Sequence, residues 1–392
     1  MSRAPESQGS VEDNQYRAGR YIRQASGYRA FIPAPLPPKP PIHISDRLQA
    51  LLSRADISLG RLDGAIQTLP DSDLFVFMYV RKEAVLSSQI EGTQSSLNDV
   101  LAAEAQILSP EAPRDVAEVL NYVAAMNDGI ARLATLPVSV RLIKELHERL
   151  LAGVRGAAKS PGEIRRSQNW IGAGGALLSD ATFVPPPPDD VPQALSDWER
   201  FVHDDTPMPL LVKIGLAHAQ FETIHPFLDG NGRVGRLLIA LLLVERQVLQ
   251  RPVLYVSHYF KRHRSLYYDR LQAIRDVGDW EPWIEFFLAA VGEVADEAAS
   301  TARKIVELRE RHRALVLREL GRGASSGLHV LEMLYSRPIV AVADVMAVTK
   351  TSYAAANNLV SRLETLGVLS EITGHARNRR FRYEEYVRMF SE

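Results

Sequence analysis

The densest group of chemically competent residues lies between two apolar helical patterns, in the segment 225–236, which reads HPFLDGNGRVGR. Gly230 and Gly232 allow the backbone to turn tightly, so that successive N–H groups point at one spot. A helix that starts at about Arg233 adds the positive end of its dipole there. Arg233 and Arg236 are three residues apart on one helical face, so both can reach the same anion. The segment therefore predicts a phosphate-binding loop.

Two further side chains add reactive chemistry to this loop. Asp229 offers a hard oxygen ligand to the Mg²⁺ that accompanies a nucleoside triphosphate. His225 titrates near neutrality and is suited to act as general base for a hydroxyl, a role worth roughly 10²–10⁴ in rate. A glycine loop that merely precedes a buried helix would account for the glycines, but not for the histidine, the acid and the two arginines together. We therefore predict a nucleotide site with a base at its edge.

The loop resembles the signature of the Fic family, HPFx(D/E)GNGRxxR, at every fixed position. The resemblance continues in GEIRRSQNWIG at 162–172, in YVSHYFKRHRSLYYDRL at 255–271 and in GDWEPWIEFFL at 278–288, and it covers roughly residues 45–291. It implies an adenylyltransferase that uses ATP and Mg²⁺ to move AMP onto a hydroxyl side chain of a protein substrate and of itself.

The same resemblance implies a role for each loop residue. His225 would deprotonate the acceptor hydroxyl, which attacks the α-phosphate in line, while Asp229 holds Mg²⁺ and Arg236 meets the γ-phosphate. The other positions implied to bind the nucleotide are Phe227, Gly230, Asn231, Gly232 and Arg233. A relative whose loop departs from GNG acts as a kinase with inverted nucleotide, so the glycines here favour AMP transfer.

A second motif, SSQIEG at 87–92, lies in the N-terminal helical region. Ser87, Glu91 and Gly92 resemble the family's inhibitory sequence, (S/T)xxxE(G/N). Ser87 and Glu91 are four residues apart and share a helical face. A Glu-Gly helix end is common, so this motif gains its meaning from the loop at 225–236. The resemblance implies that Glu91 pairs with Arg236 and occupies the donor that the γ-phosphate needs, an inhibition that requires no separate protein.

The adenine base needs an apolar or aromatic slot. Tyr267, Tyr268 and Trp283 are candidates by their position after the loop, although aromatic residues at helical spacing are more often core. His218 lies two turns before His225 and is expected to be a packing residue. No other His/Asp cluster has metal-ligand spacing.

Apolar periodicity predicts the elements that carry these motifs. The helical patterns cover 46–107, 116–133, 138–151, 191–203, 210–223, 234–245, 264–277 and 283–311. Short β-prone runs at 170–184, ended by four prolines, predict a hairpin, here called the flap. Its edge is suited to receive a target segment as an added strand, or it is an ordinary hairpin over the core. We expect an all-α, mainly helical fold with this short flap.

The two ends of the chain differ from this helical centre. Residues 1–44 are expected to form an arm that is poorly ordered over 1–30 and continues as an extended polyproline segment at 31–42. The N-terminal helical region with the inhibitory motif is placed at 45–110 and the catalytic core at 111–320. A linker at 321–327 leads to 325–392, where helix, helix–turn–helix and two strands around Gly374 follow the order of a winged helix. Thr349 or Ser352 would cap its third helix and Gly367 would end it.

Charge leaves the partner of the predicted winged helix open. Residues 325–392 carry a net charge of only +1, and HARNRR at 375–380 is their one concentrated basic patch. The sequence favours two interpretations equally. One is DNA contact, with Asn357, Asn358 and Arg362 as presumed readers of the bases; the other is protein docking or a homodimer.

Composition excludes several classes of protein. The chain has 392 residues, no cysteine, and 46 Lys/Arg against 47 Asp/Glu, so disulfides, thiolate sites and a global field for nucleic acid or membranes are excluded. Its longest apolar stretch, 237–244, is far shorter than the ~20 residues that span a bilayer. A cytoplasmic protein without a membrane partner is expected. Two other functions stay open: removal of AMP, with Glu91 activating water, and a DNA-binding regulator that senses a nucleotide.

Overall fold

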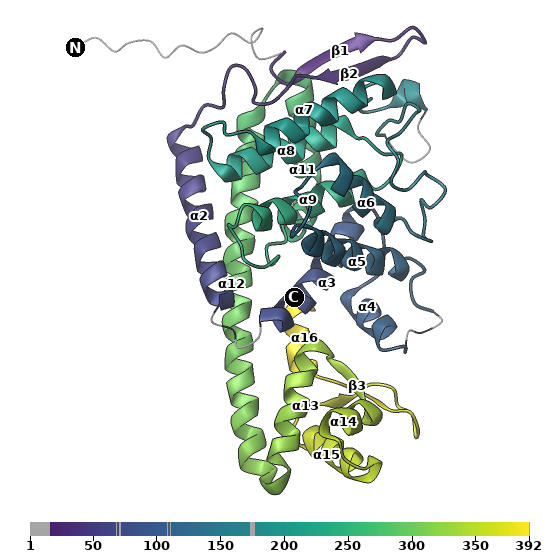
Figure 1. Cartoon of the computed structure of the whole chain (residues 1–392), viewed down its shortest axis with the longest axis vertical. Coiled ribbons are helices and arrows are strands. Elements are labelled where there is room, and N and C mark those ends of the chain that lie inside the picture. The colour runs from purple at the N-terminus through teal and green to yellow at the C-terminus, as the bar shows by residue number, and fades with distance from the viewer. Residues whose placement is uncertain are drawn as a thin grey trace, which may run out of the picture.

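A single long helix organises the molecule (Figure 1). The structure is a computed structural model that describes residues 16–391 apart from 68, 70, 71, 108, 110 and 173–176. Helix α12 (Trp280–Glu319) has 40 residues, which at 1.5 Å per residue gives a length of about 60 Å. Helix α2 (Asp46–Gln67) packs along one half of α12, and the other described helices gather beside it.

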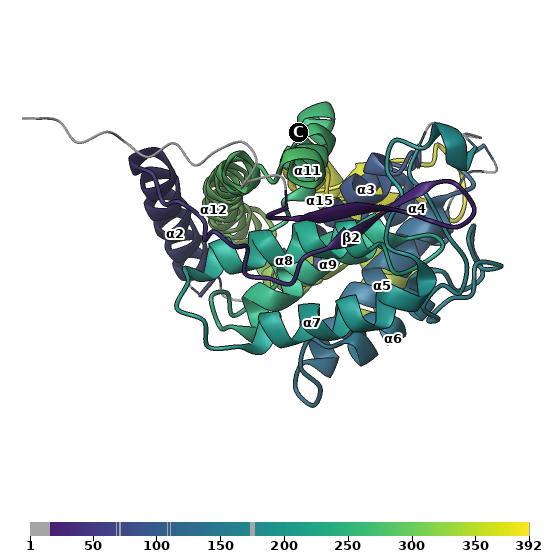
Figure 2. The same ribbon diagram turned by 90° about the horizontal axis from the view of Figure 1, so that it is seen from above.

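The centre of the molecule is a pair of helices that are buried on almost every side. These are α8 (Leu210–Ile224) and α9 (Asn231–Glu245), and nearly all their residues are inaccessible to solvent. A helix that is apolar around its whole circumference is stable only inside a layer of other elements. That layer includes α3 (Ser72–Ile90), α5 (Val116–Arg132), α6 (Val140–Leu150), α7 (Val191–His203), α11 (Arg264–Val277) and part of α12. The short helix α10 (Ser257–Arg262) reaches α8 through the ring of Phe260, which lies 5.9 Å from that of His218. Figure 2 shows α8 and α9 between α7 on one side and α11 and α12 on the other.

The helical pattern predicted at 46–107 divides into three helices instead of running on. They are α2, α3 (Ser72–Ile90) and α4 (Leu97–Glu104). Gly92, with φ of 97°, adopts a backbone that favours glycine and follows the end of α3. Ser96 then caps α4 through a reciprocal capping box with Asp99. The predicted inhibitory motif therefore lies at the carboxyl end of α3 and in the turn that follows.

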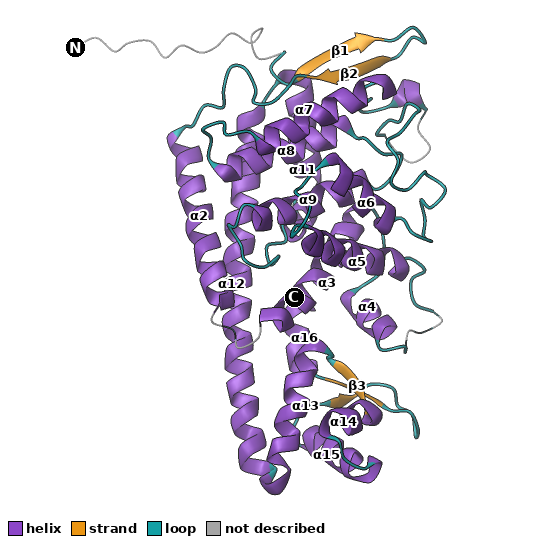
Figure 3. Ribbon diagram, in the orientation of Figure 1, coloured by secondary structure: helices purple, strands orange, loops and turns teal. Residues whose placement is uncertain are grey.

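The expectation of a poorly ordered arm is wrong for residues 19–30. Strands β1 (Gly19–Arg23) and β2 (Arg29–Pro33) form an antiparallel hairpin, with Gly19 paired to Pro33. Figure 3 shows this hairpin at the end of the molecule that lies furthest from the C-terminal elements. Phe31 is fully buried, and its N–H donates to the carbonyl of Val184, 2.9 Å away. Composition pointed to a polar arm, but one buried aromatic residue and this backbone bond attach the segment to the flap.

In the flap, Ile171 and Phe183 form an isolated antiparallel bridge, and none of the other flap residues that the structure describes forms a strand. Gly174 and Gly175, around which the sequence predicts β-prone runs, lie outside the described residues. A short 3₁₀ turn, η1 (Leu178–Asp180), lies within the flap, and a second, η2 (Pro188–Asp190), follows it.

The C-terminal elements pack at the far end of α12 (Figure 1). They are η3 (Gly321–Gly323), α13 (Ala324–Ser336), β3 (Ile339–Ala341), α14 (Val342–Thr349), α15 (Tyr353–Thr365), β4 (Ser370–Glu371), β5 (Arg380–Arg382) and α16 (Glu384–Ser391). The sheet order is β3-β5-β4. Ser352 caps α15 by accepting the N–H of Ala355. The predicted linker is wrong, because η3 and the first turn of α13 occupy 321–327. The assignment to a winged helix and the domain boundaries stay predictions.

The last helix reaches back to the N-terminal helical region. The ring of Phe390 on α16 lies 5.4 Å from that of Tyr79 on α3 and 6.4 Å from that of Phe75. Among the residues described, none of the helices is both long and apolar enough to span a membrane.

Candidate active site

His225 stands at the carboxyl end of α8, where the chain leaves the helix. Its backbone is left-handed, with φ of 50° and ψ of 60°. Its Nδ1 lies 3.3 Å from the carbonyl oxygen of Glu222. A carbonyl oxygen only accepts, so this contact places the proton on Nδ1 and leaves Nε2 with a free lone pair. Burial, and then the nearby Arg275 and Arg165 guanidiniums, lower the pKa of His225 to about 4. The imidazole is therefore neutral at pH 7 and able to accept a proton.

The loop between α8 and α9 is braced by its own asparagine. Asn231 accepts the N–H of Phe227 with Oδ1 and donates to the carbonyl of Phe227 with Nδ2, both at 2.8 Å. Gly230, with φ of 76°, makes the turn that starts α9. The first N–H groups of a helix have no partner within it, so the N–H groups of 231–233 are the donors that an anion at the predicted loop would meet.

His147, which the sequence analysis missed, supports the loop from α6. Its Nδ1 accepts the N–H of Gly162 at 2.9 Å. The proton must then be on Nε2, which lies 3.0 Å from the carbonyl oxygen of Asp229 and donates to it. The ring stacks on Phe227 with the centroids 3.7 Å apart. Phe227 is fully buried, so it supports the loop and presents no surface to a nucleotide. No sequence signal marks His147, because its partners are 15 and 82 residues away.

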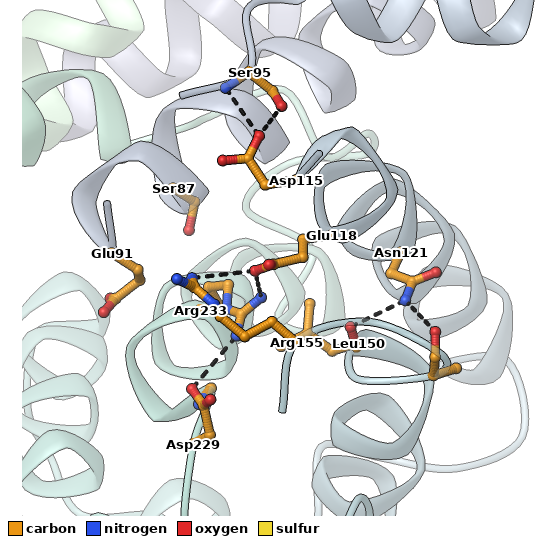
Figure 4. A network of polar contacts seen from close by, with 12 residues as sticks. Ser87, Glu91, Ser95, Asp115, Glu118, Asn121, Leu150, Arg155, Asp229 and Arg233 are labelled. Atoms are coloured by element: carbon orange, nitrogen blue, oxygen red, sulfur yellow. Dashed lines mark hydrogen bonds and ion pairs between the residues drawn. The ribbon is translucent and has the colours of Figure 1, made fainter. Parts of the chain in front are cut away.

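Arg233 is held by carboxylates from two elements (Figure 4). Its Nη1 lies 3.3 Å from Oε2 of Glu118 on α5, and its Nη2 lies 3.6 Å from Oδ1 of Asp229. Oε2 of Glu118 also forms an ion pair with Nη2 of Arg155, 3.3 Å away. Only 1% of the Arg233 side chain is exposed, whereas 37% of Asp229 is. The arginine is thus oriented before any phosphate arrives, and Asp229 keeps a face toward solvent.

Arg236 contacts the predicted inhibitory segment, residues 87–92. Its Nε donates to the hydroxyl of Ser87 at 2.9 Å, and its Nη2 donates to the carbonyl of Ser87 at 3.0 Å and to Oε1 of Glu91 at 2.7 Å. A side chain at Gly232 would collide with Glu91, so the carboxylate lies directly over the first turn of α9. Burial tends to raise the pKa of Glu91, but Arg236 outweighs it and the pKa is lowered. Glu91 is therefore an ionised carboxylate that lies over the predicted phosphate-binding loop.

The turn after the predicted inhibitory segment is hydrogen-bonded to the residue that precedes α5, the helix whose Glu118 contacts Arg233 (Figure 4). Asp115, which precedes α5, accepts the N–H of Gln94 at 2.7 Å and the N–H of Ser95 at 3.2 Å. Glu118, which holds Arg233, follows one turn later on that helix. Helix α5 therefore sets the position of the inhibitory turn relative to the loop.

Two buried carboxyl groups near Arg236 were also missed. Burial raises the pKa of Glu83 and of Glu222 to about 7. Oε1 of Glu83 accepts from the hydroxyls of Ser257 and Tyr122, while one oxygen of each glutamate has no hydrogen-bond partner within the described residues. Both stand on helices at positions that resemble ordinary surface glutamates in the sequence.

The three aromatic candidates for the adenine slot separate clearly. Tyr267 is 1% exposed, and its hydroxyl lies 3.0 Å from Nε2 of His218. Trp283 is fully buried and donates to the carbonyl of Gly215. Tyr268 alone of the three is at the surface, 39% exposed; burial and then Glu91 raise its pKa to about 12. Tyr267 and Trp283 are thus core residues, and His218 is a packing residue as expected.

Among the described residues, no group of three or more His, Cys, Asp and Glu is arranged to hold a metal ion. A partly exposed Asp229 beside a phosphate site fits Mg²⁺ nonetheless, since Mg²⁺ is commonly held by one or two carboxylates with the substrate's phosphates and water.

Curated relatives of the chain are named protein adenylyltransferase Fic. The one from Drosophila ananassae is 31% identical over 182 residues, which are 46% of this chain and 33% of the relative. The one from Drosophila yakuba is 29% identical over 263 residues, 64% of this chain and 47% of the relative. The chain thus spans a third to about half of the length of these relatives.

Solved structures share the fold. A Fic family protein from Desulfovibrio desulfuricans G20 superposes with a TM-score of 0.57 at 22% identity, over 88% of this chain and 97% of the other. A Fic domain containing signaling protein from Bacteroides thetaiotaomicron VPI-5482 gives 0.51 at 17% identity, over 66% and 97%. The family models described as Fic/DOC family N-terminal and Fic/DOC family match residues 49–131 and 137–243. Helices α3 and α8, the loop at 225–236 and all but the last two residues of α9 fall within them. Residues 49–131 and 137–243 of the chain are therefore Fic/DOC family domains.

Proposed function

We propose that the protein transfers AMP from ATP to a hydroxyl side chain of target proteins and of itself. The observation that carries the proposal is the pairing of a neutral imidazole with a cationic helix start across one short loop. His225 closes α8, and Arg233 and Arg236 stand in the first turns of α9. The name of the curated relatives agrees with this reaction.

Each step of the reaction has a residue suited to it. The N–H groups of 231–233 and the side chain of Arg233 bind the phosphates of ATP. Asp229 would hold Mg²⁺, which neutralises phosphate charge when bound. Nε2 of His225 takes the proton from the acceptor hydroxyl as its oxygen bonds to the α-phosphorus. The bond from that phosphorus to the bridging oxygen breaks, and pyrophosphate leaves. Tyr268 is our remaining candidate for the adenine base.

We further propose that the protein is inhibited by its own Glu91. The Glu91 carboxylate lies over Gly232 and accepts a hydrogen bond from Nη2 of Arg236. A γ-phosphate would need that same donor. Two anions cannot share this space, because each repels the other and both need the same donor. Removing the carboxylate frees the guanidinium for ATP.

DNA binding receives no support from the predicted readers in α15. Arg362 donates to the carbonyls of Leu320 and Glu319 at the end of α12. Asn357 accepts from Arg379 of the predicted wing at 3.0 Å. Two of the three readers therefore have partners within the chain, and we assign no DNA partner.

Intact-mass spectrometry after incubation with ATP and Mg²⁺ tests the reaction. The Glu91→Gly variant is expected to gain the mass of one or more AMP groups, and the Glu91→Gly/His225→Ala variant is expected to gain none. ATP labelled at the α-phosphate should label the protein, whereas ATP labelled at the γ-phosphate should not. If the protein instead retained label from the γ-phosphate, the reaction would be phosphorylation and the proposal of AMP transfer would be wrong.

A further inference from the structure

The end of α8 that carries His225 is surrounded by two buried arginines outside the signature loop. Arg165 comes from the segment before the flap and is 3% exposed; Arg275 comes from α11 and is 6% exposed. The last carbonyl groups of a helix lack partners within it and carry partial negative charge. Both guanidiniums supply donors to this end.

Arg165 holds the backbone of His225 itself. Its Nε donates to the carbonyl of His225 at 2.9 Å, and its own N–H donates to the carbonyl of Pro226 at 3.0 Å. Its Nη2 donates to the carbonyl of Pro186 beyond the flap. A left-handed backbone is unfavourable for a residue with a side chain, so it needs such contacts to persist.

Arg275 holds the group that determines the tautomer of His225. Its Nη2 donates to the carbonyl of Glu222 at 3.2 Å, the same oxygen that accepts from Nδ1 of His225. Its Nε lies 3.3 Å from the hydroxyl of Thr223. Its guanidinium also lies over the ring of Phe183 in the flap, 3.9 Å from the centroid. The contact connects the flap to the acceptor of the base.

The charges around His225 favour its neutral form. Those that act on it are Arg165 and Arg275, which oppose a proton, and Glu91, which favours one. Glu222 faces the same region, but burial raises its pKa to about 7, so near neutrality it offsets the arginines only in part. The balance is positive, and an imidazolium there is repelled.

We propose that Arg165 and Arg275 are positioning residues for His225: they fix its left-handed backbone and its Nδ1–H tautomer, and thereby direct Nε2 to the reacting hydroxyl. The inference rests on the proposed function, and it adds that the base is set by residues from the flap segment and α11. Arg275 also makes the base sensitive to the position of Phe183.

Arg275→Gln in the Glu91→Gly background is the decisive variant. Loss of one charge-assisted hydrogen bond predicts a fall in kcat of about 10–100-fold with the KM for ATP nearly unchanged. Loss of the cation predicts a higher pKa of His225, seen as a shift of the acid limb of kcat/KM to higher pH. Histidine ring NMR, with His225→Ala assigning the signal, measures the same pKa without any turnover. Arg270→Gln, on the same helix, is the matched control.

Arg275→Lys and Arg165→Lys retain the charge but lose the paired contacts. They should therefore lower kcat, but they should raise the pKa of His225 less than Arg275→Gln does. The two lysine variants test the positioning role if Arg275→Gln does not fold, as judged by its thermal melt. An unchanged kcat and an unchanged histidine pKa in folded variants would overturn the proposal. If the Glu91→Gly parent transfers no AMP, the proposed function fails, while the NMR titration still decides what the arginines do to His225.

Discussion

Removal of the Glu91 carboxylate is the perturbation that tests the site most directly. Glu91→Gly abolishes the 2.7 Å contact to Nη2 of Arg236 and clears the space over Gly232. It leaves Arg236 in place, because Nε and Nη2 still donate to the hydroxyl and the carbonyl of Ser87. Glu91 lies in the turn after α3 and precedes Gly92, so a glycine there interrupts no helix.

The size of the effect follows from that contact. A hydrogen bond between charged groups is worth roughly 1.5–3 kcal/mol net, and each ~1.4 kcal/mol is a factor of ten. Because 33% of the Glu91 side chain is exposed, solvent screens the pair and the lower part of this range applies first. AMP transfer should rise by about 10–100-fold.

The assay is the initial rate of self-labelling from ATP labelled at the α-phosphate, with ATP below its KM. Glu91→Gln is expected to give a smaller rise, since the amide loses the charge but still lies over Gly232. Glu111→Gly, at an exposed turn, is the matched control and should leave the rate unchanged. If Glu91→Gly labels no faster than the parent or no faster than this control, the inhibitory role of Glu91 is refuted.

Three further outcomes are expected. His225→Ala should bind ATP as the parent does in calorimetry but lose AMP transfer, and undiminished labelling would contradict its role as base. Burial raises the pKa of Glu83 to about 7 from 4.5. Between these values the unfolded chain loses this proton and the folded chain keeps it, so rising pH destabilises the parent. Glu83→Gln should therefore gain stability relative to the parent between pH 5 and pH 8, up to about 3 kcal/mol in denaturant unfolding, and a pH-independent difference would count against this. Phe390→Ala should cost roughly 3 kcal/mol by removing the ring that packs on Tyr79, measured as a lower midpoint in urea.

Much of the helical framework was predictable because its period is local. Residues 191–203 are helical as predicted, and α5, α6, α8 and α11 agree within about two residues, the usual uncertainty of helix ends. Short elements were not predicted, because their sequence pattern spans too few residues. Helix α10 has six residues and no full apolar period, and the β1–β2 hairpin depends on a bond to the flap.

By itself, the sequence predicted which groups are reactive, since glycines, arginines, an acid and a histidine at this spacing are typical of a phosphate-binding loop whatever surrounds them. The pairing of Glu91 with Arg236 was implied by resemblance and required the structure to bring residues 145 positions apart to 2.7 Å. Only the tertiary structure decided which aromatic ring is exposed, that His147 and Glu118 hold the loop, and that His225 is neutral. Those properties depend on burial and on contacts between distant segments, and neither is encoded in any local spacing.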